Sequence, residues 1–164
     1  KTGEDSMKTV AWVAAITLVL DQLSKWLVVH VMSLDSRLAI DVLPPFLNFR
    51  MAWNYGINFG LLNGGETTKW VLISVALGIV LFVLVWLRRD PPGWPGLVAG
   101  GLLVGGAIGN VVDRLLYGAV ADFLNMSCCG IENPFAFNVA DIAIFAGALG
   151  LVLLPGKKPG KNGT

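Results

Sequence analysis

Four long apolar stretches, separated by polar segments, dominate the sequence. About 20 apolar residues in a helix, at about 1.5 Å per residue, cross a hydrocarbon core about 30 Å thick. We therefore predict membrane-spanning helices over residues 9–31, 69–87, 95–117 and 137–154. The third stretch contains five glycines that permit close contact between helices: Gly100, Gly101, Gly105, Gly106 and Gly109.

The segment between the first two helices, residues 33–68, has a different pattern. Pro44 and Pro45 break any helix, and residues 47–54 alternate between apolar and polar side chains. An alternation with a period of two predicts a strand with one apolar face. We expect a small extramembrane β-sheet here, whose open edge could hold an extended peptide by β-augmentation. Residues 54–60, Asn-Tyr-Gly-Ile-Asn-Phe-Gly, fit either a turn-rich loop or part of a site.

Basic residues predict the orientation. Cytoplasmic segments carry an excess of lysine and arginine, so both termini are predicted to be cytoplasmic, with residues 33–68 and a loop over residues 118–136 outside. We therefore predict a mainly α membrane protein, a four-transmembrane-helix bundle with a small extramembrane β-sheet. We expect one membrane domain over residues 7–155 and a cytoplasmic tail over 156–164, and we interpret residues 1–6 as an expression remnant outside the fold. The basic residues that share one side are Lys8, Arg88, Arg89, Lys157, Lys158 and Lys161.

Composition supports the membrane class. With 55% hydrophobic and 14% charged residues among 164, and a mean hydropathy of +0.69, the chain is more apolar than a soluble domain of this size. A formal net charge of +1 without a basic stripe gives no reason to expect a nucleic-acid partner. Cys128 and Cys129 are adjacent and poorly placed to bridge each other, and His30 is the single histidine. We therefore expect no disulfide, no metal and no cofactor.

Two aspartates lie close to the same predicted membrane interface. Asp122 comes about five residues after the third helix, and Asp141 lies about four residues into the fourth helix. Ionisable groups near a bilayer are costly and are functional candidates by default. Apolar neighbours would raise the pKa of a carboxyl, and two carboxylates in one site can share a proton. The pair could serve an aspartic peptidase as acid and base with water as the nucleophile, or it could be two unrelated interfacial carboxylates.

Asp21 and Lys25 are four residues apart in the first helix and share a face. One reading is an ion pair inside the bundle. The other is that Asp21 faces a polar pocket while Lys25 extends toward lipid headgroups.

The end of the third helix carries Asn110, Asp113 and Arg114, three and four residues apart, and these can share a face. Asn138 lies three residues before Asp141 in the same way. The two asparagines could orient a substrate carbonyl or the aspartates. Arg114 could hold a phospholipid or a peptide carbonyl, or it could form a local ion pair with Asp113.

Five motifs occur in a fixed order along the chain and together resemble the lipoprotein signal peptidase family, also called signal peptidase II, from about Thr9 to Leu154. The first motifs are Asp-Gln-Leu-Ser-Lys at 21–25 and Asn-Tyr-Gly-Ile-Asn-Phe-Gly at 54–60. The others are Gly-Gly-Ala-Ile-Gly-Asn-Val-Val-Asp-Arg at 105–114, Gly-Ala-Val-Ala-Asp-Phe at 118–123 and Phe-Asn-Val-Ala-Asp at 137–141.

The resemblance implies a multi-pass aspartic endopeptidase of the bacterial inner membrane, with its active site near the periplasmic face and a periplasmic β-cradle. Such an enzyme removes the signal peptide of a prolipoprotein by cutting before the cysteine that carries diacylglycerol. Membrane lipids are expected partners and globomycin-like cyclic peptides expected inhibitors. On the matching positions the catalytic pair is Asp122 and Asp141. The expected substrate-binding or supporting residues are Asp21, Lys25, Asn54, Gly56, Asn110, Asp113, Arg114 and Asn138.

Two positions depart from the family pattern. Asn58 stands where a smaller residue is expected, and Ala121 stands where a bulkier aliphatic residue is expected. Both departures concern the shape of the pocket rather than the carboxylates.

A different class of function is a small proton- or ion-conducting membrane protein. In such a protein four aspartates would form a relay, namely Asp21, Asp113, Asp122 and Asp141. That function requires carboxylates distributed through the depth of the membrane, whereas three of the four, Asp113, Asp122 and Asp141, cluster toward one side. A structural membrane subunit would not need polar groups concentrated at one helix junction.

Overall fold

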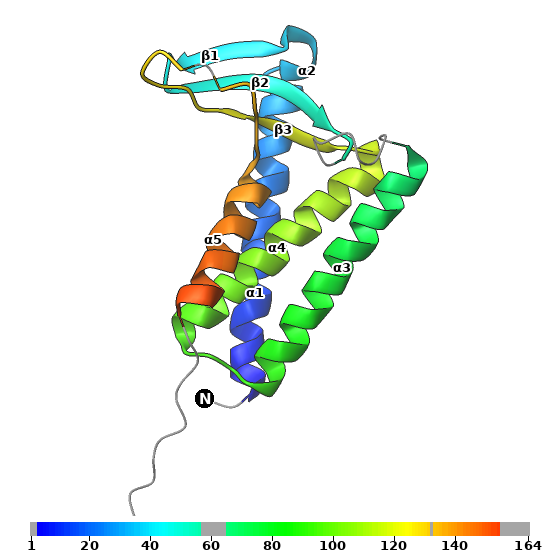
Figure 1. The fold of residues 1–164 in the computed structure, drawn as a ribbon, viewed down its shortest axis with the longest axis vertical. Helices are drawn as coiled ribbons and strands as arrows, with labels where there is room; N and C mark the ends of the chain where they lie inside the picture. The colour runs from blue at the N-terminus through cyan, green and yellow to red at the C-terminus, as the bar shows by residue number, and fades with distance from the viewer. Residues whose placement is uncertain (1–2, 57–64, 132, 155–164) are drawn as a thin grey trace, which may run out of the picture.

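The computed structural model describes residues 3–56, 65–131 and 133–154, which form a bundle of helices with a small sheet at one end (Figure 1). The expected motif residues 57–60, including Asn58, lie outside the described residues. In chain order the elements are α1 (Gly3–Lys25), the π-helical turn η1 (Trp26–Val31), α2 (Leu34–Arg37), β1 (Ala39–Leu43), β2 (Leu47–Asn54), α3 (Glu66–Arg89), α4 (Trp94–Tyr117), β3 (Val120–Asn125) and α5 (Val139–Leu153).

Three described helical segments are long and apolar enough to cross a membrane. They are α1 continued through η1, α3 and α4, with mean hydropathies of 1.4, 2.8 and 1.6. The helix α5 is apolar but has 15 residues, fewer than a typical crossing needs. The helix α1 begins at Gly3, so it includes most of the polar segment 1–6 that we expected outside the fold.

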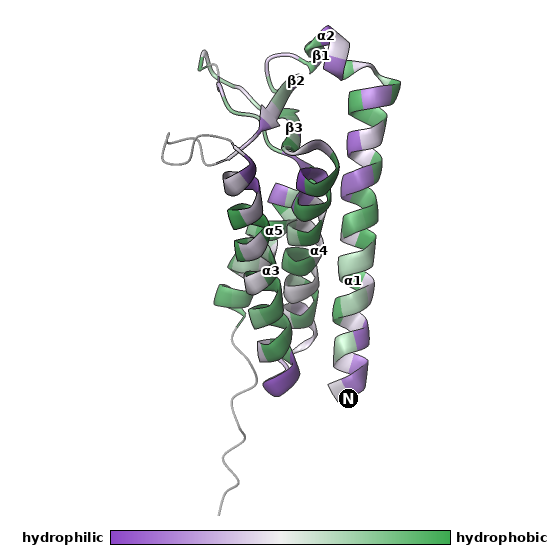
Figure 2. Ribbon diagram, turned by 90° about the vertical axis from the view of Figure 1, so that its right-hand side faces the viewer, coloured by the Kyte–Doolittle hydropathy of each residue, from purple (hydrophilic) through white to green (hydrophobic). Residues whose placement is uncertain are grey.

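Figure 2 shows that apolar residues cover most of the length of the helices, while polar residues gather at the helix ends and in the upper part of α1. The N-terminal end of α1 and the turn between α3 and α4 lie away from the sheet (Figure 1). Arg88 and Arg89 form the last turn of α3, and Lys8 lies in the second turn of α1. These three basic residues therefore lie at the end of the bundle opposite the sheet.

The helix α4 is the centre of the bundle, since it contacts α1, α3 and α5. Its glycines allow this close approach. A Cβ atom at Gly105 would lie 2.5 Å from the Ala14 carbonyl oxygen of α1, and one at Gly106 would lie 2.5 Å from the Ala140 carbonyl oxygen of α5. The expected packing role of these glycines is confirmed.

The sheet is antiparallel, with the strand order β1-β2-β3. The strand β2 covers the alternating residues 47–54, as the pattern predicted. The strand β3 falls in residues 118–136, which we expected to be a loop, and this expectation was wrong. Polar residues at Asp122 and Asn125 hide the strand in the sequence, and its partners lie about 70 residues earlier, in β2. Phe123 closes a small core beneath the sheet, with an edge-to-face contact to Phe49 at 5.7 Å.

Candidate active site

The two candidate catalytic aspartates lie on different elements that converge at the sheet end of the bundle. Asp122 is in β3, and Asp141 is in the first turn of α5. Asn138 caps this helix: its Oδ1 accepts a hydrogen bond from the Asp141 backbone N–H at 2.9 Å, and its own N–H donates to Asp141 Oδ2 at 3.3 Å. This reciprocal capping box starts α5 and fixes the Asp141 carboxylate at the same time.

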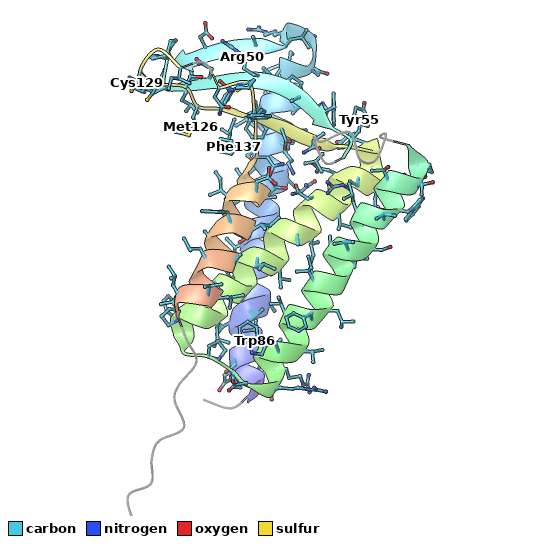
Figure 3. The ribbon with its side chains drawn as sticks, in the orientation of Figure 1. Arg50, Tyr55, Trp86, Met126, Cys129 and Phe137 are labelled. Carbon is cyan, nitrogen blue, oxygen red and sulfur yellow. The ribbon has the colours of Figure 1, made fainter. Side chains whose placement is uncertain are left out.

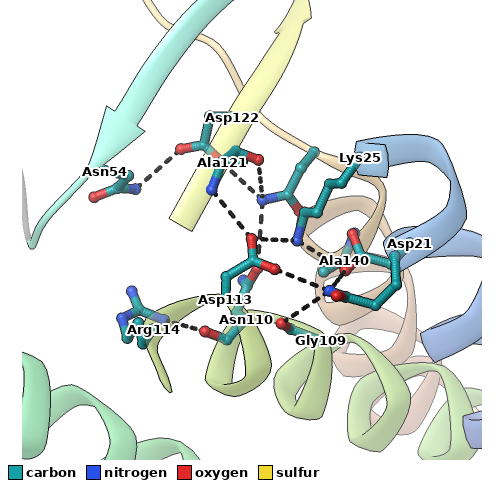
Figure 4. Close-up of polar contacts among 12 residues, drawn as sticks. Asp21, Lys25, Asn54, Gly109, Asn110, Asp113, Arg114, Ala121, Asp122 and Ala140 are labelled. Atoms are coloured by element: carbon teal, nitrogen blue, oxygen red, sulfur yellow. Dashed lines mark hydrogen bonds and ion pairs between the residues drawn. The ribbon is translucent and has the colours of Figure 1, made fainter. Parts of the chain in front are cut away.

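Two buried asparagines connect the two carboxylates (Figure 4). Asn138 Nδ2 donates to Asp122 Oδ1 at 2.7 Å and contacts Asn110 Oδ1 at 3.3 Å. Asn110 Nδ2 donates to Asp141 Oδ1 at 2.9 Å. On the other side, Asn54 Nδ2 of β2 donates to Asp122 Oδ2 at 3.1 Å. Both aspartates are thus held by neutral amide groups from three separate segments of the chain.

The environment of Asp122 favours its protonated form. The side chain is almost fully buried, and burial, followed by the nearby Asp141 carboxylate, raises the pKa of Asp122 to about 7. The hydrogen bonds from Asn54 and Asn138 act in the opposite direction, because they stabilise the ionised form. Asp122 can therefore hold or release a proton near neutral pH.

A second buried cluster lies beside the pair and is built around Lys25. Its Nζ is 2.8 Å from Asp21 Oδ2 and 2.8 Å from Asp113 Oδ2, and all three side chains are at least 93% buried. The expectation of an ion pair inside the bundle is therefore confirmed for Lys25, and the alternative that it extends toward lipid headgroups is wrong. Asp113 pairs with Lys25, so the alternative of a local ion pair between Asp113 and Arg114 is also wrong.

The cluster around Lys25 also holds the backbone next to each candidate catalytic residue. The Asp113 Oδ2 atom accepts a hydrogen bond from the Ala121 N–H at 3.1 Å, one residue before Asp122. The Asp21 Oδ1 atom accepts one from the Ala140 N–H at 2.9 Å, one residue before Asp141. The ion cluster therefore fixes the start of β3 and the start of α5 relative to each other.

Gln22 is a member of this cluster that the sequence reasoning missed. Its Nε2 donates to Asp113 Oδ1 at 2.9 Å and to Asp21 Oδ2 at 3.1 Å. A glutamine beside an aspartate in an apolar helix was the available signal. Its main partner is 91 positions away in the sequence, so spacing could not identify it.

The remaining expected residues surround the pair. Arg114 Nη1 donates to the Asn110 carbonyl oxygen at 3.2 Å, and its charge lies within electrostatic range of both aspartates of the pair. The Gly56 N–H donates to Asn54 Oδ1 at 3.2 Å and so orients that amide. A cavity of about 390 Å³ opens beside Asp122, with Trp53, Asn54 and Phe135 in its lining.

No described residues form a group of three or more histidine, cysteine, aspartate or glutamate side chains that could hold a metal ion. Cys128 and Cys129 are exposed and carry free thiols. The chemical capacity of the site thus lies in two carboxylates, a set of amides and one arginine.

Solved structures with a similar fold define the class of protein. Two bacterial membrane enzymes, determined by the in meso method at 2.3 Å and 1.9 Å resolution, have TM-scores of 0.75 and 0.76 to this chain at 27% identity. Each match includes 89% of this chain. It includes 86% of the first solved structure and 91% of the second. The fold is therefore that of a helical membrane enzyme.

Sequence comparisons define the family. The sequence model of the family described as signal peptidase (SPase) II matches residues 13–155. Lipoprotein signal peptidases from Alteromonas mediterranea and Shewanella loihica are 42% and 43% identical, each over 87% of this chain and over 77% and 82% of their own lengths. One from Methylorubrum extorquens is 44% identical over 84% of this chain and 79% of its own. The chain belongs to the signal peptidase II family and is a peptidase.

Proposed function

We propose that the chain is a membrane-embedded aspartic endopeptidase that removes the signal peptide from diacylglyceryl-modified bacterial prolipoproteins by cutting before the lipidated cysteine. The observation that carries this proposal is the pair Asp122 and Asp141, joined through Asn138, with the pKa of Asp122 raised to about 7. Its relatives are named lipoprotein signal peptidases, which supports the choice of substrate.

In this mechanism Asp122 carries the proton and Asp141 is ionised. The Asp141 carboxylate takes a proton from a water molecule, the water oxygen bonds to the scissile carbonyl carbon, and Asp122 gives its proton to the carbonyl oxygen. In the second step Asp141 gives the proton it took from water to the leaving amide nitrogen, and Asp122 takes back a proton from a hydroxyl of the tetrahedral intermediate. The C–N bond then breaks, which releases the amine and a carboxylic acid and returns both aspartates to their starting states. Asn54, Asn110 and Asn138 keep both carboxylates oriented, and Arg114 serves as a further donor to the substrate.

The proposed membrane placement puts the sheet on the periplasmic side and both termini in the cytoplasm, with α5 as the fourth crossing. Arg88 and Arg89 in the last turn of α3, together with Lys8 near the start of α1, support this orientation, because the positive-inside rule counts lysine and arginine and not net charge. At about 1.5 Å per residue, the 15 residues of α5 cover about 22 Å of a core about 30 Å thick. If its C-terminal end reaches the cytoplasmic edge, the start of α5 at Val139 lies roughly 8 Å below the periplasmic edge, and Asp141, two residues further on, lies roughly 11 Å below it.

This recessed position suits a lipidated substrate. The diacylglyceryl group can stay in the outer leaflet while the scissile bond reaches the aspartates, and each methylene kept in lipid is worth about 0.8 kcal/mol. Membrane lipids are therefore proposed partners. Globomycin-like cyclic peptides are proposed inhibitors that occupy the cavity beside Asp122.

A proton relay is less well supported by the distribution of charge. The sequence has no titratable side chain from Thr9 to Leu20 in α1 or from Gly96 to Val112 in α4. A relay across the bundle would need groups along these stretches. The carboxylates instead gather at the sheet end, as a peptidase at the interface requires.

The direct test uses purified protein in lipid with two substrates, a diacylglyceryl-modified prolipoprotein and the same chain without the lipid. We expect cleavage of the lipidated substrate before its cysteine and little of the other. Asp141→Asn should lower the rate about 10³-fold or more, because the base is lost. Cleavage by Asp141→Asn at the wild-type rate would reject the aspartic mechanism, and proton flux into liposomes without cleavage would support the relay.

A further inference from the structure

A second and larger cavity, of about 520 Å³, lies on the sheet between the β1–β2 hairpin and the chain that follows β3. Figure 3 shows this end of the molecule, with Arg50 on the hairpin and Met126 and Cys129 on the segment after β3. Polar and apolar residues line the cavity in equal share, and the polar ones are Asp41, Asn48, Arg50, Asn125, Ser127 and Asn133. None of these residues takes part in the proposed cleavage reaction.

One residue of the lining, Asn48, carries an unsatisfied hydrogen-bond acceptor. Asn48 is 7% exposed, and its Nδ2 donates to the Pro45 carbonyl oxygen at 3.4 Å. Its Oδ1 has no hydrogen-bond partner. Among the buried side-chain nitrogen and oxygen atoms of the described residues, it is the single atom without one. A buried amide oxygen without a donor is unfavourable, so native proteins normally provide a partner. The oxygen atom is itself buried, so an N–H group from a bound molecule would supply the partner when the Asn48 amide turns toward the groove.

The wall of the cavity is held in place by specific hydrogen bonds. Asn125 Nδ2 donates to the carbonyl oxygens of Asn133 at 2.7 Å and Phe135 at 2.9 Å. The Asn133 N–H donates to Ser127 Oγ at 3.1 Å. On the hairpin side, Arg50 Nη2 and Asp41 Oδ1 form an exposed ion pair at 2.7 Å. The cavity is thus a built groove with hydrogen-bonding groups along both sides.

The groove adjoins the cavity beside Asp122. Ala52, Pro134 and Ala136 line both of them. In the sheet register Ala52 pairs with Asp122, and Asn48 lies four residues before Ala52 in β2. At about 3.3 Å per residue, four residues of strand span about 13 Å, which equals the length of about four residues of extended peptide.

The chemistry of the groove determines which part of a substrate fits. The signal peptide is apolar and its place is in the bilayer, and the lipid of the modified cysteine also stays there. The chain after that cysteine is the part that leaves the membrane. An extended peptide presents backbone N–H groups along its length, which is what the Asn48 oxygen lacks.

We propose that this groove binds, in extended form, the first few residues after the lipidated cysteine, with Asn48 Oδ1 accepting a backbone N–H from that segment. This inference rests on the proposed peptidase function and adds a subsite on the carboxyl side of the scissile bond. The protein would then recognise the backbone and the length of the chain after the lipidated cysteine. The lipid and the signal peptide would be recognised elsewhere.

The test compares two lipidated substrates that differ in length after the cysteine, one ending one residue beyond it and one ending six residues beyond it. For the wild-type protein we expect the longer substrate to have a KM about fivefold lower, with kcat unchanged, because one net hydrogen bond has about this effect. Equal KM values for the two substrates would overturn the subsite. If neither substrate is cleaved, the proposed function fails instead.

Two further measurements locate the contact. Methylation of single backbone nitrogens in the longer substrate should raise KM about fivefold at one position for the wild-type protein, and this measurement needs no variant. Asn48→Leu should raise KM for the longer substrate by the same factor, leave the shorter one unaffected and remove the effect of methylation. Asp35→Asn, on the exposed helix α2 outside the groove, is the matched control and should change nothing. An additive effect of methylation and Asn48→Leu would refute the contact.

Discussion

Two groups of aspartates lie at the same end of the bundle and differ in their partners. Asp21 and Asp113 are paired with the ammonium group of Lys25 and accept backbone N–H groups. Asp122 and Asp141 are held by neutral asparagine amides instead. Lys25 places a cation beside the first two carboxylates, whereas burial and the neighbouring Asp141 carboxylate raise the pKa of Asp122 to about 7. The comparison separates carboxylates that hold the fold from carboxylates suited to chemistry.

The two groups are also connected. The ion cluster accepts the N–H groups of Ala121 and Ala140, each one residue before an aspartate of the candidate catalytic pair. A shift in the cluster therefore moves both β3 and α5. The comparison predicts that changes in the cluster act first on stability, while changes around the pair act first on rate and pH dependence.

The largest expected effect is on stability, from Lys25→Met. It leaves two buried carboxylates close together without a cation and should lower the free energy of unfolding by about 3–5 kcal/mol. Thermal unfolding in detergent measures this. Lys8→Met is the matched control, because Lys8 forms an ion pair with Glu4 at the same spacing on the exposed surface, and it should change little. Equal unfolding temperatures for the two variants would contradict the structural role of the cluster.

A smaller loss of stability is expected from Gly109→Ala. The new Cβ atom would lie 2.6 Å from Asp21 Oδ2, which the cluster holds in place, so we expect a cost of about 1–3 kcal/mol. Gly78→Ala in α3 provides the control, since no atom beyond the adjoining backbone of its own helix lies within 4 Å of the added Cβ and alanine favours a helix. The outcome that would count against close packing around Asp21 is the same unfolding temperature in both variants.

The smallest of these three effects is expected from Asn54→Leu, beside the candidate catalytic pair. Its hydrogen bond lowers the pKa of Asp122, so its loss should raise that pKa further above the ordinary value. In the proposed mechanism Asp122 must be protonated, so activity is lost as pH rises through its pKa of about 7. The alkaline limb of kcat/KM against pH should therefore move to higher pH, with a loss of about fivefold at pH 6. A limb that moves to lower pH would reject Asp122 as the acid.

The same raised pKa has a consequence for stability. The folded protein binds a proton at Asp122 that the unfolded chain, with the ordinary value of 3.8, releases earlier. The contribution of Asp122 to stability is therefore fully present below pH 4 and is lost as pH rises toward 7. Asp122→Asn should remove this dependence.

The sequence predicts the parts of the fold that depend on local pattern. Long apolar runs predict the helices, and the alternation in residues 47–54 predicts β2. Topology alone brings Asp122 and Asp141 to one interface. The strand β3 was missed because its pairing with β2 is long-range and its sequence contains Asp122 and Asn125.

The partners of the buried charges could not be predicted for the same reason. The four-residue spacing of Asp21 and Lys25 fits both a buried pair and a lysine that reaches the headgroups, and the choice depends on Asp113, 88 positions after Lys25. Asn48 looks like any polar residue of an alternating strand. Its importance depends on the segment after β3 that closes the groove around it.

The most direct test of the central claim compares Asp→Asn variants at positions 21, 113, 122 and 141 in one cleavage assay and one thermal unfolding assay. We predict that Asp122→Asn and Asp141→Asn unfold no earlier than the wild-type protein and lose cleavage by about 10³-fold or more. Asp21→Asn and Asp113→Asn should unfold at lower temperature and keep at least about one tenth of the cleavage per folded molecule, since a tenfold loss corresponds to about 1.4 kcal/mol. Cleavage by Asp122→Asn at the wild-type rate, or full stability of Asp113→Asn with no cleavage, would contradict the division of the four aspartates into a structural and a catalytic group.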